Sequence, residues 1–148
     1  MTYRVLIAEA REHLSQVYVS YIKFLLSFQR HPKIDYNPVN NVAEADRALL
    51  GDERLIIIGH LHRTQKHTQE PTARNGLEFA RHINELHGGY GGIVLAVDDN
   101  EVLKEARTIS HGSLDTIYCT DLSADQKAGE KTLARLLEDL PNLMKLPK

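Results

Sequence analysis

Short apolar runs alternate along this chain with longer segments of helical periodicity, and that alternation constrains the fold more than any other feature. The plainest run is Leu55-Ile56-Ile57-Ile58. Its continuous β-branched character is typical of a strand buried on both faces. Strands that alternate with helical segments favour a parallel sheet covered by helices on both faces. The 148 residues are enough for one domain with a core from about residue 3 to 140 and a short C-terminal tail.

The runs predict five strands, at residues 3–8, 33–39, 55–58, 93–97 and 116–119. The segments between and after them predict five helices, at about residues 11–29, 42–50, 76–87, 100–110 and 124–140. This order indicates a flavodoxin-like, doubly wound α/β fold with a five-stranded parallel sheet. In such sheets the functional crevice lies beyond the carboxyl ends of the strands.

Several residues fix details of this expectation. Pro38 interrupts the second strand and marks it as an edge strand. Asn100 is a plausible cap for the fourth helix, and Pro141 is expected to end the fifth, with a frayed tail after it. The first helix is expected to face the sheet through Leu14, Val17, Tyr21, Leu25 and Phe28.

Composition narrows the classes of function. The net charge is −2, which argues against nucleic acid or an anionic membrane as the main partner, because phosphate binding relies on a basic patch. The single cysteine, Cys119, cannot form an internal disulfide and fits a cytoplasmic protein. A buried, inert thiol is the favoured reading of this residue. No apolar run approaches the ~18 residues of a membrane span, and the N-terminus lacks the layout of a signal peptide.

Four segments resemble the response regulator receiver domain. Residues 4–9 (Arg-Val-Leu-Ile-Ala-Glu) are similar to the start of a receiver, and residues 75–78 (Asn-Gly-Leu-Glu) to the opening of its third helix. Residues 92–95 (Gly-Ile-Val-Leu) resemble its fourth strand, and residues 120–123 (Thr-Asp-Leu-Ser) the segment after its fifth strand. The resemblance implies a receiver-like (βα)5 fold over nearly the whole chain.

The resemblance also implies a phosphorylation pocket, but here the pocket is degenerate. A working receiver has two acids after the first strand, an acceptor Asp after the third, a Ser or Thr after the fourth and a Lys after the fifth. These parts bind a metal ion and accept and neutralise a phosphoryl group. The residues at these positions are, in chain order, Glu9, Ala10, Gly59 or His60, Ala96, and Cys119 or Thr120.

With one acid left, the chain resembles a pseudo-receiver, an atypical response regulator of two-component signalling. The expected activity is phosphorylation-independent binding of another protein, without enzymatic catalysis and without a cofactor. The partner would be a signalling kinase, a regulator or a second copy of the chain. In the family, the fourth helix, fifth strand and fifth helix commonly carry such contacts, which here points to Leu103, Tyr118 and Lys127. The alternative is that these three side chains only pack or face water.

A second hypothesis concerns the long loop after the third strand. His60, His62 and His67 could act as metal ligands, with Glu9 as a fourth, in a metal- or small-molecule-binding domain or a minor hydrolase. The basic residues of this loop would repel a cation, so a solvated polar loop is favoured. Asp98 and Asp99 follow the fourth strand, where capping of the next helix is favoured over acid–base chemistry.

Overall fold

The computed structural model describes residues 2–27, 33–66, 69–86, 90–109, 114–119 and 140–144. Within these ranges it contains one parallel sheet in the order β2-β1-β3-β4-β5. The strand β2 lies on one side of β1, and β3, β4 and β5 follow on the other side. This order is that of a doubly wound α/β fold, so the predicted fold is confirmed. The strands are β1 (Thr2–Ala8), β2 (Lys33–Val39), β3 (Leu55–Ile58), β4 (Gly92–Val97) and β5 (Leu114–Tyr118).

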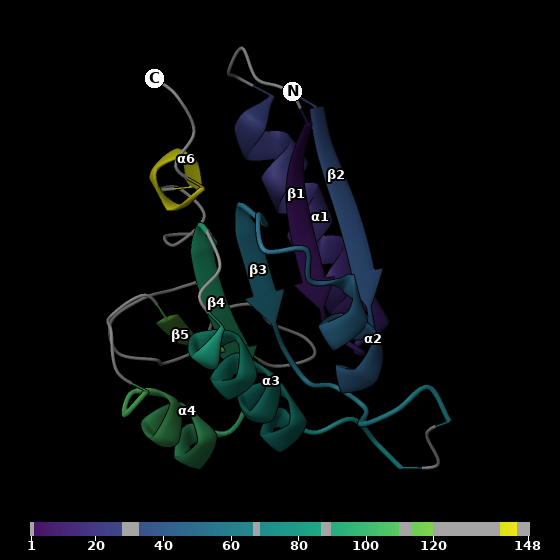
Figure 1. Ribbon diagram of the computed structural model, residues 1–148, viewed down its shortest axis with the longest axis vertical. Coiled ribbons are helices and arrows are strands. Elements are labelled where there is room, and N and C mark those ends of the chain that lie inside the picture. The colour runs from purple at the N-terminus through teal and green to yellow at the C-terminus, as the bar shows by residue number, and fades with distance from the viewer. Residues whose placement is uncertain are drawn as a thin grey trace.

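Helices cover both faces of the sheet. One face carries α1 (Glu12–Leu26) and the short α6 (Leu140–Leu143). The other carries α2 (Val42–Ala48), α3 (Ala73–Glu85) and α4 (Asn100–Ala106). In Figure 1, α1 lies behind β1 and β2, while α2 and α3 lie in front of the sheet. Two apolar cores result, one on each side of the buried strands β3 and β4.

The edge position of β2 explains why a proline is tolerated there. The backbone N–H of Glu9 donates to the carbonyl of Val39 at 3.0 Å, so the polar groups of Val39 face β1. Because these groups alternate along a strand, those of Pro38 face away from the sheet. The missing N–H of Pro38 therefore costs no ladder hydrogen bond, and the predicted edge strand is confirmed.

Helix α1 faces the sheet through a different stripe from the one predicted. Its buried residues are Leu14, Tyr18, Ile22 and Leu26. Tyr21 is 41% exposed, so its predicted inward position is wrong, and Phe28 lies outside the described residues. The helix carries apolar residues on two overlapping stripes, and periodicity alone did not distinguish them.

Side-chain caps, one from a threonine and one from an aspartate, set the starts of α3 and α4. The hydroxyl of Thr72 accepts from the N–H of Asn75 at 3.1 Å, so α3 begins three residues before the predicted start. Asp99 caps α4 by accepting from the N–H groups of Glu101 and Val102 at 2.9 and 3.1 Å. The cap predicted at Asn100 is therefore wrong, and capping by the Asp98-Asp99 pair is confirmed for Asp99.

The C-terminal residues that the structure describes belong to the core. Residues 140–143 are helical, so Pro141 does not end the last helix as predicted. A proline fits the first turn of a helix, where its missing N–H would have no partner. Leu140 and Met144 are fully buried in the core that contains α1, so fraying directly after Pro141 is also wrong. The remainder of the predicted fifth helix lies outside the described residues. Among the described helices, none combines the length and apolarity needed to cross a membrane.

Candidate functional site

The candidate site lies where the carboxyl ends of four strands meet, at the lower end of the sheet in Figure 1. Glu9 follows β1, Gly59 and His60 follow β3, Asp98 follows β4 and Cys119 follows β5. The sheet thus brings together the positions that the receiver resemblance implied. The packing between them is dominated by a residue that sequence reasoning did not single out, Arg11.

Arg11 and Glu9 form a buried bidentate ion pair. The Nη2 and Nε atoms of Arg11 donate to Oε1 and Oε2 of Glu9 at 2.7 and 3.0 Å. The backbone N–H of Arg11 also donates to Glu9 Oε2, at 3.0 Å. Glu9 is 3% exposed, and such fork-to-fork pairs are among the stronger hydrogen-bonded contacts in proteins.

The guanidinium of Arg11 also reaches the ends of two further strands. It donates from Nη2 to the carbonyl of Ala96 in β4 and from Nη1 to the carbonyl of Cys119 after β5, each at 3.2 Å. Arg11 is the N-cap residue of α1, and its side chain makes no cap there. A cation is unfavourable at a helix N-terminus, so Glu9 and the two carbonyls account for its position. One positive charge therefore joins the ends of β1, β4 and β5.

The Glu9 carboxylate occupies the space beside Gly59. A Cβ built on Gly59 would overlap Oε1 of Glu9, so this position accepts only glycine while Glu9 keeps its present conformation. Gly76 of α3 is also confined, because a Cβ there would overlap the carbonyl oxygen of Gly59. Residue 59 is thus confined by Glu9 on one side and approached closely by α3 on the other.

The charges of this pair are coupled. Burial raises the pKa of the Glu9 carboxyl, and the hydrogen bonds and charge of Arg11 oppose that rise. For Arg11, burial acts to lower the pKa, but the contacts with Glu9 outweigh it and the pKa is raised. The bidentate geometry accords with the direction at Arg11, which keeps its proton. The positive charge at this site is therefore the guanidinium of Arg11, which is bonded to the carboxylate of Glu9.

His60 is held by its backbone and by its side chain. Its carbonyl accepts from the N–H of Ala10 at 2.8 Å, and its backbone N–H bonds to the Glu9 carboxylate. The side-chain atom Nε2 lies 2.7 Å from Oδ1 of Asp98. His60 thus connects the end of β1 to the residue that follows β4.

The structure places most of the predicted pocket residues together. Ala10 and His60 share a hydrogen bond, and the carbonyls of Ala96 and Cys119 share the Arg11 guanidinium. Thr120 lies outside the described residues. Arg11 was missed because its role depends on a side chain folding back over the sheet. The available signal was an arginine two residues after the acid, combined with glycine at the acceptor position.

Cys119 has the buried environment that its sequence context favoured. Its side chain is fully buried, and Sγ lies 3.4 Å from the hydroxyl of Tyr18. Burial raises the pKa of the Cys119 thiol, with Tyr18 and Arg11 acting in the opposite direction. Burial also raises the pKa of Tyr18 well above its ordinary range. Both groups are therefore kept protonated at neutral pH, and a neutral thiol is a weak nucleophile.

The histidines of the long loop lie among different neighbours. His60 contacts Asp98, whereas His62 lines a cavity with Arg63, Lys66 and other polar residues. His67 lies outside the described residues. No set of three or more potential metal-ligating side chains converges within the described part of the chain.

The residues predicted for a partner interface have unequal exposure. Leu103 is 2% exposed and packs in the core beneath α4, so its predicted contact with a partner is wrong. Leu103 lies with Val102 and Ala106 on the buried side of α4, in the core on that face of the sheet. Tyr118 is half-buried against the same core, and Lys127 lies outside the described residues.

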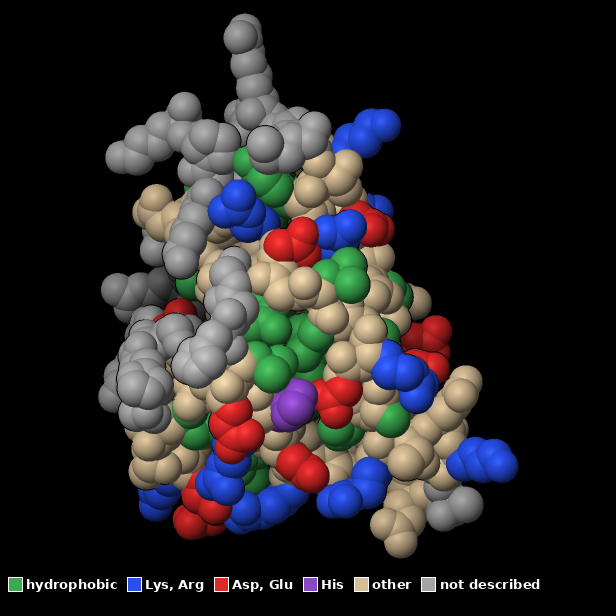
Figure 2. Space-filling view, viewed as in Figure 1, with side chains coloured by type: hydrophobic (Ala, Val, Ile, Leu, Met, Phe, Trp, Pro, Cys, Tyr) green, Lys and Arg blue, Asp and Glu red, His purple; other side chains and the backbone are tan. Residues whose placement is uncertain are grey.

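Charges of both signs are mixed on the face formed by α2 and α3 (Figure 2). Arg74 and Arg81 of α3 pair with Glu105 of α4 at 2.5 and 3.6 Å. Arg63 pairs with Glu78 at 3.2 Å. Each arginine named here thus lies beside an acid, although two of them share Glu105, and this differs from the basic patch used to bind phosphates.

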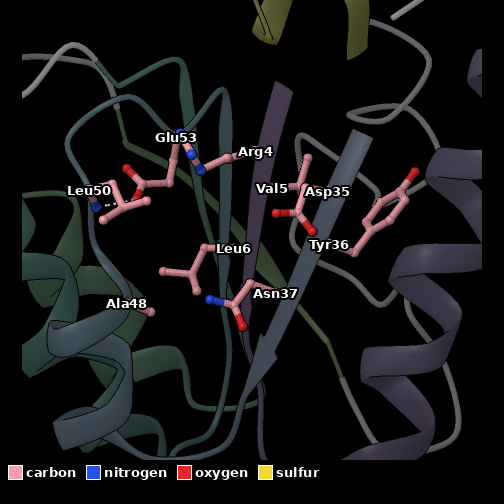
Figure 3. A pocket seen from close by; sticks show the side chains of 9 residues that line it. All are labelled: Arg4, Val5, Leu6, Asp35, Tyr36, Asn37, Ala48, Leu50 and Glu53. Carbon is pink, nitrogen blue, oxygen red and sulfur yellow. Dashed lines mark hydrogen bonds between the residues drawn. The ribbon is translucent and has the colours of Figure 1, made fainter. Parts of the chain in front are cut away.

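A cavity of about 240 Å³ lies away from this site, over the middle of β1 and β2. Figure 3 shows Asn37 of β2 beside Leu6 and Asp35 farther up the same strand, while Tyr36 points away toward α1. The carboxylate of Glu53 at its border accepts from the N–H groups of Leu50 and Gly51, at 2.5 and 3.1 Å. Glu53 is thereby committed to the turn that follows α2.

Comparison with known proteins bears on the fold. The chain matches no protein-family model, and no curated protein matches it. Among solved structures it is similar to a DNA-binding response regulator of the LuxR family from Staphylococcus aureus, with a TM-score of 0.58 and 13% identity. The match covers 96% of this chain and 98% of the other. The fold is receiver-like. At this identity the likeness shows the fold alone.

Proposed function

We propose that this protein is a pseudo-receiver, a signalling module that acts by binding another protein and that neither accepts a phosphoryl group nor catalyses a reaction. One observation carries the proposal. The Glu9 carboxylate, held by Arg11, occupies the space where a side chain at residue 59 would have to stand. A phosphoryl acceptor needs a carboxylate nucleophile with room for the incoming group.

The charge arrangement supports the same proposal. Phosphoryl transfer to a receiver needs cations that neutralise the transferred group, and Mg²⁺ is held by one or two carboxylates together with phosphate oxygens. The buried acid of this site, Glu9, already has both oxygens bound to Arg11. The guanidinium of Arg11 in turn donates hydrogen bonds to Glu9, Ala96 and Cys119. Few of its N–H groups therefore remain to bind a phosphate.

The test is incubation of the full chain with Mg²⁺ and a small acyl phosphate, followed by intact mass spectrometry. A receiver with an acceptor aspartate serves as the positive control. We expect no mass gain in this chain under conditions that phosphorylate the control. A gain of one phosphate that disappears in Glu9→Gln or in Asp98→Asn would overturn the proposal and locate the acceptor.

The partner is proposed to be a signalling protein of the cytoplasm, either a kinase or regulator or a second copy of this chain. The contact is assigned to the surface of α4 and β5, where Glu101, Lys104 and Arg107 are exposed and Tyr118 is half-buried. Sedimentation velocity over a wide range of concentration tests the second copy. Self-association that weakens in Lys104→Glu but not in Lys66→Glu supports it, and a strict monomer at the highest concentration removes it.

A further inference from the structure

The Nε2 atom of His60 faces a hydrogen-bond donor and an acceptor of the same residue. It lies 2.7 Å from Oδ1 of Asp98 and 3.4 Å from the backbone N of Asp98. A protonated Nε2 can only donate, and it then bonds to the carboxylate. A neutral ring carries its single proton on Nε2 or on Nδ1, and with the proton on Nδ1 the bare Nε2 accepts from the backbone N–H. A second ring proton excludes the accepting form and adds a positive charge to the short bond with the carboxylate.

The pair spans two parts of the fold that the proposed function concerns. His60 directly follows Gly59, and its carbonyl is bonded to the N–H of Ala10. Asp98 directly precedes Asp99, whose side chain caps the first turn of α4. The contact of His60 with Asp98 thus ties the closed acceptor position to the start of α4, a helix of the proposed partner surface.

We propose that protonation of His60 regulates this surface, by tightening the tie to Asp98 and so holding the first turn of α4 against the end of β3. This inference rests on the proposed function, since it assigns a regulatory input to the same site. The input is a proton in place of a phosphoryl group. Mildly acidic conditions favour the tied state, and mildly alkaline conditions favour the looser one.

The acid that we expect to respond to the charge of His60 is Asp98, whose Oδ1 lies 2.7 Å from Nε2. Among the described residues, Glu9 approaches His60 from the end of β1, but its carboxylate is committed to Arg11 and to the backbone N–H of His60. Asp99 follows Asp98 and is committed to capping α4. The His60 side chain is 13% exposed and that of Asp98 is 40% exposed, so protons reach the pair from solvent.

Amide hydrogen exchange of the full chain, measured by NMR, tests the proposal. The reporters are the N–H groups of Glu101 and Val102, both bonded to Asp99. After correction for intrinsic exchange, they should exchange on the order of threefold more slowly near pH 6 than near pH 8, the effect of one partly exposed ion pair. The titration midpoint of the His60 ring should move to lower pH in Asp98→Asn.

Variants separate the effect of the contact between His60 and Asp98 from general effects of pH. Asp98→Asn and His60→Gln should each abolish the difference in exchange. Asp46→Asn is the matched control, because Asp46 lies 3.6 Å from another histidine, His82, on α2 and α3, and it should leave the difference intact. Equal protection at both pH values, or an unchanged difference in Asp98→Asn, overturns the proton-operated tie. Neither result bears on the phosphodonor experiment, which tests the pseudo-receiver proposal separately.

Discussion

The carboxylate of Glu9 and the α-carbon of Gly59 lie in contact across the ends of β1 and β3, so that even a methyl group on residue 59 would overlap Glu9 Oε1. Replacement of Gly59 by Ala should therefore lower the free energy of unfolding by about 1–3 kcal/mol, the usual cost of overpacking a core. Chemical denaturation measures this change. A variant as stable as the parent would show that Glu9 moves aside at little cost.

The Glu9–Arg11 pair predicts strong coupling between two substitutions. Glu9→Gln or Arg11→Met alone leaves a buried partner without its counter-charge, which costs about 3–5 kcal/mol. The double variant should lose clearly less than the sum of the two single losses. A double-mutant cycle by denaturation measures the coupling. Strict additivity would contradict a direct interaction between the two side chains.

Alkaline pH should destabilise the fold through Tyr18 and Cys119. Burial raises the pKa of both groups in the folded state above the ordinary values of 10.0 and 9.0. The unfolded chain therefore loses these protons first. The stabilisation is complete below the ordinary values and declines as the pH rises past 9.0, then past 10.0.

The variant Tyr18→Phe isolates part of this effect. It removes the phenol, so the stability of the variant should decline less steeply than that of the parent above the ordinary phenol value of 10.0. Unfolding midpoints at a series of pH values provide the measurement. Identical slopes in the two proteins would show that Tyr18 does not contribute.

Pro38 should protect the edge of the sheet against pairing with another chain. Its polar groups face outward from β2, and Pro38→Val adds an outward N–H donor there. We expect more self-association, visible in light scattering as a function of concentration, with a change in stability of no more than about 1 kcal/mol. Asn37→Thr is the control, because it raises strand propensity on the same strand without a new outward donor. Equal association of both variants would contradict this role.

The strands were predictable because each one carries a local signal. The run of β3 is apolar throughout, and β2 carries its edge marker in Pro38. Helix α1 shows where such signals fail. Its sequence holds two apolar stripes, and only contact with the sheet selects the one that contains Tyr18 and Ile22 over the one that contains Tyr21.

The candidate site was predictable in its positions but not in its chemistry. The resemblance placed Glu9 and Gly59 at the strand ends, and the structure brings them together. The role of Arg11 depends on carbonyls that are 85 and 108 residues away in the chain. Hydrogen bonds of that range leave no periodic pattern in a sequence, so only the folded chain reveals them.

The positive charge at the end of β5 belongs to Arg11 and is therefore covalently part of the polypeptide. Chelators cannot remove this charge, and its presence does not depend on the concentration of divalent ions. The positive charge of Arg11 is consequently present at this edge of the sheet from the moment of folding and lasts for the lifetime of the molecule.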